Sequence, residues 1–258
     1  MTSDVLLVDV GADLRFLLPS RRRAGPVPVR VDGESTLGHV VESLGVPLTE
    51  VGELLLDGRR ADPGGRAGPG CLVVRPVSRP QTTPTNPPRF LLDVHLGSLS
   101  RRLRLLGLDA AYEPDADDAA LVERAAAEQR VLLTQDRGLL RRRALPQGAY
   151  VRGHGVEPQA DDVLDRFAPD LAPWTRCVAC GGVLEPVPRG AVEHLLQPGT
   201  RRTYDEFARC AGCGRPYWRG AHARRLEAAV HRAHEVVARR RRAVDGGPAG
   251  RGPGIVGG

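Results

Sequence analysis

The chain has 258 residues, of which 41% are hydrophobic, and a formal net charge of +6. This length allows two or three small domains with hydrophobic cores, and no apolar run approaches the roughly 20 residues that a membrane-spanning helix needs. The N-terminus also lacks the charged and apolar regions of a signal peptide, so we expect a cytoplasmic protein without a membrane partner.

The charge pattern favours an anionic partner only modestly. The 37 basic residues are all arginines, and they accompany 31 glycines and 22 prolines, as in proteins from GC-rich genomes. A basic balance of this origin is a weak indication of nucleic-acid binding.

Residues 1–78 show the element order of a β-grasp domain. A helix is predicted from Thr36 to Leu44, with Thr36 or Ser35 as N-cap and Gly45 as the C-terminal stop. Strands are predicted where apolar residues alternate with polar ones, at Val5–Val10, Leu14–Leu18, Val27–Val31, Glu53–Leu56 and Cys71–Pro76. A hairpin, a helix and two further strands indicate an α+β domain.

Residues 79–88 form the predicted linker. The segment Thr82–Pro88 reads T-T-P-T-N-P-P, and proline at this density can neither join a sheet nor continue a helix. We therefore place a domain boundary here.

Residues 89–170 alternate between strands and helices. Strands are predicted at Arg89–Asp93, Ala110–Tyr112, Val131–Thr134 and Ala149–Arg152. Helices are predicted at Leu96–Leu106, Ala119–Gln129 and Gln159–Phe167, with a short one at Arg137–Arg143. This alternation predicts an α/β fold, with a parallel sheet flanked by helices.

Three acidic residues lie at or just after the predicted strand ends. Asp93 ends the first strand, Asp118 precedes the second helix, and Asp136 follows the third strand. Strand ends of a parallel sheet meet at one edge, and carboxylates gathered there suit Mg²⁺ or Mn²⁺, which can assist phosphodiester hydrolysis. Asp118 and Asp136 could instead cap helices, whereas Asp93 follows an apolar strand and would be buried without a partner.

Four cysteines form two C-x-x-C pairs, Cys177 with Cys180 and Cys210 with Cys213, separated by 29 residues. Two such pairs complete the tetrahedral sulfur shell that Zn²⁺ prefers, with no position left open for chemistry. Redox dithiols or two disulfides are the alternatives, but neither pair starts a helix after a strand. We expect a zinc ribbon and a C-terminal helix over residues 171–232, in a reducing compartment.

Aromatic and basic residues follow the second cysteine pair. Trp218 and Arg219 could contact unpaired bases and phosphates, whereas Tyr217 or Trp218 could instead form the small core of the ribbon. His222 could approach phosphate, and so could the Arg141–Arg143 run after Asp136. Residues 233–258 read as an Arg-rich and then Gly/Pro-rich tail. We expect Arg239–Arg242 to be a solvated face or tail before a nucleic-acid contact, and the Gly/Pro-rich part to be disordered rather than a conjugation signal at Gly257-Gly258.

The first domain resembles the ubiquitin-related sulfur carriers over residues 4–77, with "STLGHVVESLGVPLTEV" placed like the helix and turn of that family. Functional carriers end in Gly-Gly directly after the last strand. Here the strand ends Arg75-Pro76-Val77, so we expect no carrier chemistry.

Residues 89 to about 230 resemble the Mut-seven C-terminal RNase family. The resemblance rests on "RFLLDVHLGSLSRRLRLLGLDAAY", "DDAALVERAAAEQRVLLTQDRGLL" and "CGRPYWRGAHARRL". It implies a PIN-like nuclease domain with its own zinc ribbon, often behind a ubiquitin-like domain. It also implies an acidic metal site at Asp93, Asp118 and Asp136, with Arg101 or Arg104 near it. Typical PIN nucleases use four acids, and Ala119 and Ala120 stand where relatives commonly carry further acids.

The predicted function is a metal-dependent ribonuclease that acts on single-stranded or loop RNA. Structural Zn²⁺ and catalytic Mg²⁺ or Mn²⁺ are the expected cofactors. The expected RNA contacts are Arg101, Arg104, Arg137, Arg141, Trp218, Arg219 and His222. The alternatives are a non-catalytic nucleic-acid-binding protein with a vestigial site, and an adaptor whose β-grasp domain binds a protein partner.

Overall fold

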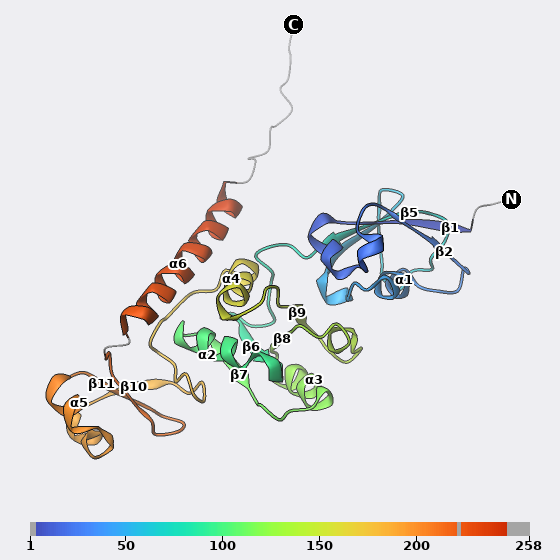
Figure 1. The fold of residues 1–258 in the computed structure, drawn as a ribbon. Helices are drawn as coiled ribbons and strands as arrows, with labels where there is room; N and C mark the ends of the chain where they lie inside the picture. Colours follow the sequence, from blue (N-terminus) through green and yellow to red (C-terminus); the bar gives the residue numbers. More distant parts are fainter. Residues whose placement is uncertain (1–3, 221–222, 247–258) are drawn as a thin grey trace, which may run out of the picture. The chain divides into compact units, whose positions relative to one another are not determined.

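The computed structural model describes residues 4–220 and 223–246 (Figure 1). The chain divides into two compact units, Met1–Gly97 with Ala111–Arg152 and Ser98–Ala110 with Gly153–Gly258. Among the described helices, none combines the length and the apolar character needed to cross a membrane.

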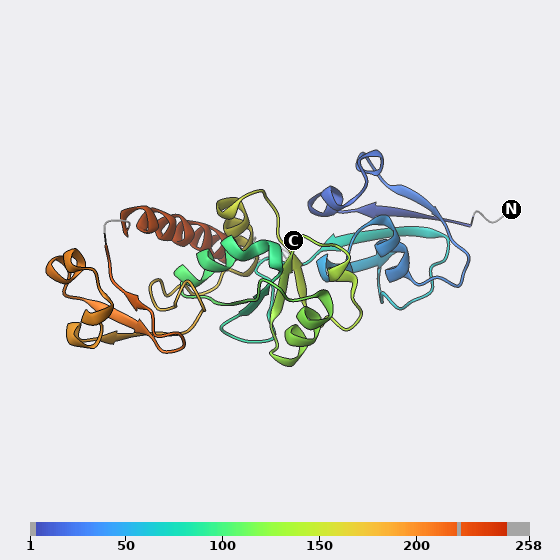
Figure 2. The same cartoon turned by 60° about the horizontal axis from the view of Figure 1, so that its bottom comes forward.

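The N-terminal β-grasp domain contains a five-stranded sheet in the order β2-β1-β5-β3-β4. The domain is drawn in blue to cyan in Figures 1 and 2. Its strands are β1 (Val5–Val10), β2 (Val27–Arg30), β3 (Val51–Leu56), β4 (Arg59–Ala61) and β5 (Gly70–Pro76). Strand β1 pairs antiparallel with β2 and parallel with β5. The sequence predicted all of these strands except the short β4.

Helix α1 (Leu37–Leu44) begins one residue after the predicted start and ends at the predicted Leu44, with Thr36 as its N-cap. The Thr36 side chain accepts a hydrogen bond from the His39 N–H, and Gly45 ends the helix with a left-handed φ of 114°. The apolar face of α1 packs on the sheet, and Val41 in its centre is fully buried against the core that includes Leu6, Val8 and Leu72. The buried apolar residues of α1 itself, Leu37, Val40, Val41 and Leu44, recur at helical spacing, which favours a helix here.

The predicted strand at Leu14–Leu18 is wrong, because Ala12–Leu17 forms a 3-10 helix. Leu14, Leu17 and Leu18 are all buried, and their i, i+3, i+4 spacing places them on one side of a helical turn. The Arg15 Nε donates to the carbonyl oxygen of Val10 at 2.9 Å, which supports the turn. The apolar residues of this segment therefore follow a helical period and not the two-residue period of a strand.

The second sheet has the order β7-β6-β8-β9. Its strands are β6 (Arg89–Leu92), β7 (Asp109–Tyr112), β8 (Val131–Thr134) and β9 (Gly148–Tyr150). Strand β8 pairs parallel with both β6 and β9, which confirms the predicted parallel α/β sheet. The register aligns Leu92 with Leu133, so the carboxyl ends of β6 and β8 are adjacent.

Helices alternate with these strands, as α2 (Gly97–Leu105), α3 (Asp118–Ala127) and α4 (Val156–Phe167). On α3, Leu121, Val122 and Ala125 are buried in one cluster with Leu91 of β6 and Leu132 of β8. The short helix expected at Arg137–Arg143 is only the 3-10 turn Leu139–Arg141. Both of its leucines are buried, and its arginine is exposed.

The ribbon is a three-stranded antiparallel sheet in the order β10-β11-β12. Its strands are β10 (Leu184–Val187), β11 (Phe207–Cys210) and β12 (Pro216–Tyr217), and the short helix α5 (Pro198–Thr203) precedes β11. Apart from Cys177 and Cys210, the buried residues described here form one small cluster of Val192, Leu196 and Phe207. A hydrophobic core of this size is too small to stabilise the fold alone, and small domains of this kind commonly rely on a bound metal or on disulfides.

Helix α6 (Ala223–Asp245) continues into the segment expected to be a tail. Its Ala233, Val236 and Val237 are buried, and it packs against α4. Arg240 donates to both carboxylate oxygens of Asp165, at 2.8 and 2.7 Å. The arginine run is therefore helical up to Asp245, because α4 supplies an apolar surface and matching carboxylates. The predicted disorder at Gly257-Gly258 lies outside the described residues.

Gly107, which follows α2, occupies a position that no other residue fits. Its φ is 83°, and an added Cβ would lie 2.0 Å from the carbonyl oxygen of Ala172. We expect Gly107→Ala to lower the free energy of unfolding by about 3 kcal/mol through backbone strain and overpacking. Gly190→Ala is the control, because nothing lies within 4 Å of its added methyl group. Equal denaturation midpoints for the two variants would contradict this expectation.

Candidate metal centre and acidic site

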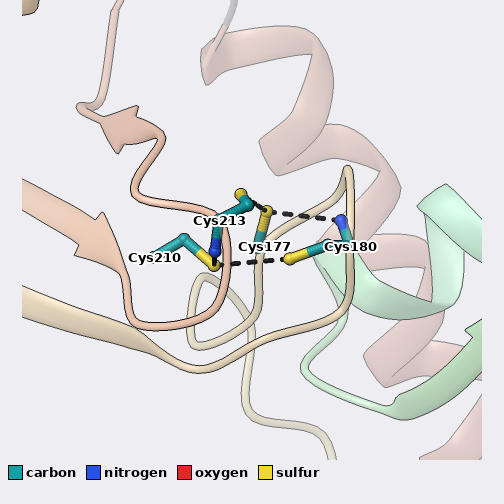
Figure 3. A group of neighbouring side chains, drawn as sticks. All are labelled: Cys177, Cys180, Cys210 and Cys213. Atoms are coloured by element: carbon teal, nitrogen blue, oxygen red, sulfur yellow. Dashed lines mark hydrogen bonds between the residues drawn. The ribbon is translucent and has the colours of Figure 1, made fainter.

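The four cysteines lie together as a potential metal centre (Figure 3). Their sulfur atoms are all within 4.8 Å of one another. The Cys177 Sγ lies 3.7 Å from that of Cys213, and the Cys180 Sγ lies 3.4 Å from that of Cys210. This arrangement could hold a metal ion such as zinc, since four thiolates match its preferred tetrahedral shell.

The two knuckles repeat one backbone pattern. The Gly181 N–H donates to the carbonyl oxygen of Cys177 at 2.8 Å, and the Gly214 N–H donates to that of Cys210 at 2.9 Å. Both glycines have left-handed φ values, 83° and 71°. Each turn also directs a backbone N–H toward sulfur, from Cys180 to the Cys177 Sγ and from Cys213 to the Cys210 Sγ, both at 3.4 Å. The loops are thus shaped for thiolates, which attract N–H dipoles.

Tyr217 contacts the buried sulfur of the first knuckle. Its hydroxyl lies 3.0 Å from the Cys177 Sγ. Burial raises the pKa of the Cys177 thiol, but hydrogen bonds from Tyr217 and from the backbone N–H groups of Cys180 and Ala179 lower it to about 6. Tyr217 therefore stabilises the thiolate, which is the form that binds metal.

Arg104 on α2 supports the same knuckle, and this corrects its predicted role in contacting RNA. The residue is 2% exposed. Its guanidinium donates to the carbonyl oxygens of Ala110 at 2.8 Å, Ala179 at 2.7 Å and Val178 at 3.3 Å. Two of these carbonyls lie between Cys177 and Cys180, so Arg104 holds the metal loop and is not available to phosphate.

We expect Arg104→Met to release zinc faster than the wild-type chain. Methionine fills much of the space but leaves the partly buried carbonyls of Ala110, Val178 and Ala179 without the Arg104 donor, at a cost of about 1–3 kcal/mol. A colorimetric chelator measures the release rate. Arg101→Met is the matched control, because Arg101 is exposed on the same helix and its side chain donates, among the described residues, to the Ser98 Oγ alone. Equal release rates from the two variants would contradict the supporting role of Arg104.

Asp93 and Asp136 are connected through one buried hydroxyl. The Thr134 Oγ1 donates to the Asp93 Oδ2 at 2.5 Å and accepts from the Asp136 N–H at 2.9 Å. Asp93 is 6% exposed and Thr134 is fully buried. The adjacent carboxyl ends of β6 and β8 therefore place the Thr134 hydroxyl between the Asp93 carboxylate and the Asp136 backbone N–H.

Asp136 also caps the turn that follows it. Its Oδ1 accepts from the Gly138 N–H at 2.6 Å and from the Leu139 N–H at 3.4 Å. The capping alternative considered for Asp136 thus holds for one carboxylate oxygen. The other oxygen, Oδ2, is not used in this cap.

Asp118 lies apart from this pair. The N-cap of α3 is Asp117, whose Oδ1 accepts from the Ala120 N–H at 2.8 Å, so Asp118 itself is not the cap. Its carboxylate pairs instead with Arg142 at 3.3 Å. Within the described ranges, the four cysteines are the only group of three or more potential ligands that lie close enough to share an ion. The three aspartates do not form such a group.

The remaining residues predicted to contact nucleic acid lie in different environments. Arg141 is exposed and pairs with no other described residue, whereas the Arg137 Nη1 donates to the carbonyl oxygen of Leu17 at 2.6 Å. Trp218 is 38% exposed. The Arg219 guanidinium lies 5.6 Å from the ring centroid of Trp174. His222 lies outside the described residues.

Thr134 and Tyr217 are the site residues that sequence reasoning did not assign. The "TQD" segment carries a signal for Thr134, since a hydroxyl between a buried strand and an aspartate can accept the aspartate N–H in a local turn. Tyr217 gave a weaker signal, because its contact with Cys177 spans 40 positions of the chain.

Family models match most of the chain. The Mut7-C RNAse domain model covers residues 88–230, and the Mut7-C ubiquitin model covers residues 5–82. Neither curated proteins nor solved structures gave a match. The RNAse model suggests a nuclease-like protein that binds nucleic acid, and its matched region includes both the acidic pair and the cysteine cluster. The chain therefore belongs to the Mut7-C RNAse domain family, with a Mut7-C ubiquitin domain in front.

Proposed function

We propose that this protein is a metal-dependent ribonuclease. Asp93, Asp118 and Asp136 would hold Mg²⁺ or Mn²⁺, and nearby arginines would bind the RNA backbone. The observation that carries the proposal is the contact between Asp93 and Asp136 through Thr134, at the strand ends of a domain matched by an RNAse model.

The residues of this pair fit a divalent cation. Asp93 is a nearly buried carboxylate at a strand end, and such a charge is costly without a positive partner. Its Oδ2 is oriented by Thr134, which leaves Oδ1 for a cation. Asp118 would become a ligand of the cation only if its carboxylate left the ion pair with Arg142.

In this mechanism the protein's residues would orient the metal-binding carboxylates and neutralise the negative charge of the RNA backbone. Thr134 fixes the Asp93 carboxylate and the Asp136 backbone, so that neither has to be ordered when substrate arrives. When bound, the cation would activate water and stabilise the charge that develops on the phosphate. Arg142, once free of Asp118, and exposed Arg141 would neutralise the RNA backbone.

A cleavage assay tests the proposal directly. The full-length chain is incubated with labelled structured and unstructured RNA, with and without Mn²⁺. We expect Mn²⁺-dependent cleavage, faster on the unstructured RNA, since unpaired strands expose bases and backbone. No cleavage of either RNA with Mn²⁺ or Mg²⁺ would reject the ribonuclease.

A second function, a nucleic-acid-binding protein with a vestigial site, is favoured by the ion pair between Asp118 and Arg142. Calorimetric titration with Mn²⁺ separates the two functions. A ribonuclease site binds Mn²⁺ in a manner that depends on Asp93, whereas a vestigial site gives no binding that depends on this carboxylate.

The metal of the cysteine cluster would be structural zinc, because four thiolates leave no position for water or substrate. Trp218 and Arg101 would add RNA contacts outside the acidic pair, and the β-grasp domain would bind a protein partner. A thiolate cluster of this kind suits a reducing compartment, so we place the protein in the cytoplasm.

A further inference from the structure

The β-grasp domain and the parallel sheet are held together by directed polar contacts within one compact unit. The Tyr150 N–H at the end of β9 donates to the Glu50 Oε1 at 2.8 Å. The Arg152 Nη2 donates to the carbonyl oxygen of Asp13 at 2.8 Å. These contacts join residues that are at least 100 positions apart in the chain.

The contact between Glu50 and Tyr150 is largely buried, whereas the contact between Arg152 and Asp13 lies at the exposed edge. Glu50 is 1% exposed, and a carboxylate at that depth requires fixed donors. The rings of Phe16 and Tyr150 lie 5.4 Å apart, and the Arg152 guanidinium lies 4.6 Å from the Phe16 centroid. Tyr150 packs against the hydrophobic clusters of both domains. The β-grasp domain and the parallel-sheet domain therefore share a packed interface and are not joined by the linker alone.

One of these interdomain contacts reaches the acidic pair. Arg137 directly follows Asp136, and its Nη1 donates to the carbonyl oxygen of Leu17 in the β-grasp domain at 2.6 Å. Gly45 lies beside this bond, since an added Cβ would sit 2.8 Å from the same carbonyl oxygen. Glycine at this position therefore lets the end of α1 approach the Leu17 carbonyl oxygen that accepts from Arg137.

The turn that carries Asp136 is thus held from two sides. On one side Thr134 accepts the Asp136 N–H and donates to Asp93. On the other side Arg137 binds the β-grasp backbone. A continuous path of covalent and hydrogen bonds therefore runs from Leu17 to the Asp93 carboxylate.

We propose that the β-grasp domain is a positioning part of the acidic site, acting through the bond from Arg137 to Leu17. Arg137 is then a positioning residue and does not contact RNA. The inference deepens the proposed ribonuclease and rests on it where metal use is concerned. The order of the Asp136 turn itself can be measured without any activity.

The test compares Arg137→Ala with Arg137→Lys and with Arg59→Ala in the full-length chain. Arg59 is the matched control, because it is exposed in the β-grasp domain and pairs with no other described residue. Loss of one charge-assisted hydrogen bond should speed amide exchange of Gly138 and Leu139 about tenfold. The Mn²⁺ concentration for half-maximal cleavage should rise about tenfold, with KM for RNA unchanged. Lysine should recover part of both effects.

The outcomes separate the two proposals. If Arg137→Ala has the same amide exchange rates and the same Mn²⁺ requirement as the wild type and Arg59→Ala, the positioning role is wrong. The proposed ribonuclease function is then unaffected. If the wild-type chain cleaves no RNA, the ribonuclease falls, and amide exchange alone decides whether the β-grasp domain orders the turn. If Arg137→Ala raises KM for RNA and leaves the amide exchange of Gly138 and Leu139 unchanged, Arg137 contacts RNA and does not position the turn.

Discussion

Asp93→Asn is expected to abolish Mn²⁺-dependent cleavage, with kcat/KM falling roughly a hundredfold or more. Asparagine keeps an oxygen that can accept from Thr134, so the local structure should remain. It removes the negative charge, which in a nearly buried position is the main attraction for a cation. Cleavage of labelled RNA across a range of Mn²⁺ concentrations measures the effect.

The control for this variant is Asp115→Asn. Asp115 is an exposed acid in the loop before α3, and the same chemical change there should leave cleavage intact. Both variants should retain the wild-type circular dichroism and zinc content. Full activity of Asp93→Asn would show that the carboxylate at the end of β6 is not catalytic.

Cys177→Ser is expected to lose the bound zinc and the ordered ribbon. Cys177 is the most buried of the four cysteines and the one that Tyr217 contacts. Structural zinc contributes about 10–16 kcal/mol of apparent free energy in small zinc domains, far more than the few buried side chains of this ribbon supply. Elemental analysis for zinc and limited proteolysis of residues 177–217 would measure the loss.

The matched control is Cys71→Ser, because Cys71 is exposed on β5 and lies outside the cluster. Zinc content should stay at the wild-type level in this variant. Lowering the pH should weaken zinc binding in the wild type, since protons compete for the thiolates. An ordered ribbon in metal-free Cys177→Ser would refute a structural metal.

The sequence by itself was sufficient for features that depend on local spacing. Two C-x-x-C pairs with following glycines predicted the cysteine cluster, because each knuckle is closed by hydrogen bonds within a few residues. Thr36 and Gly45 fixed the ends of α1 for the same reason. Alternating strands and helices predicted the parallel sheet.

Tertiary structure decided what depends on partners distant in the chain. Arg104 and Arg137 resemble other arginines in sequence, yet each donates to carbonyls at least 70 positions away, in the metal loop and in the β-grasp domain. The helical Arg239–Arg242 run depends in the same way on Asp165 of α4. Asp118 stands at the start of α3, where its carboxylate pairs with Arg142. Charged side chains are long and have many possible partners, so only the folded chain shows which one each of them takes.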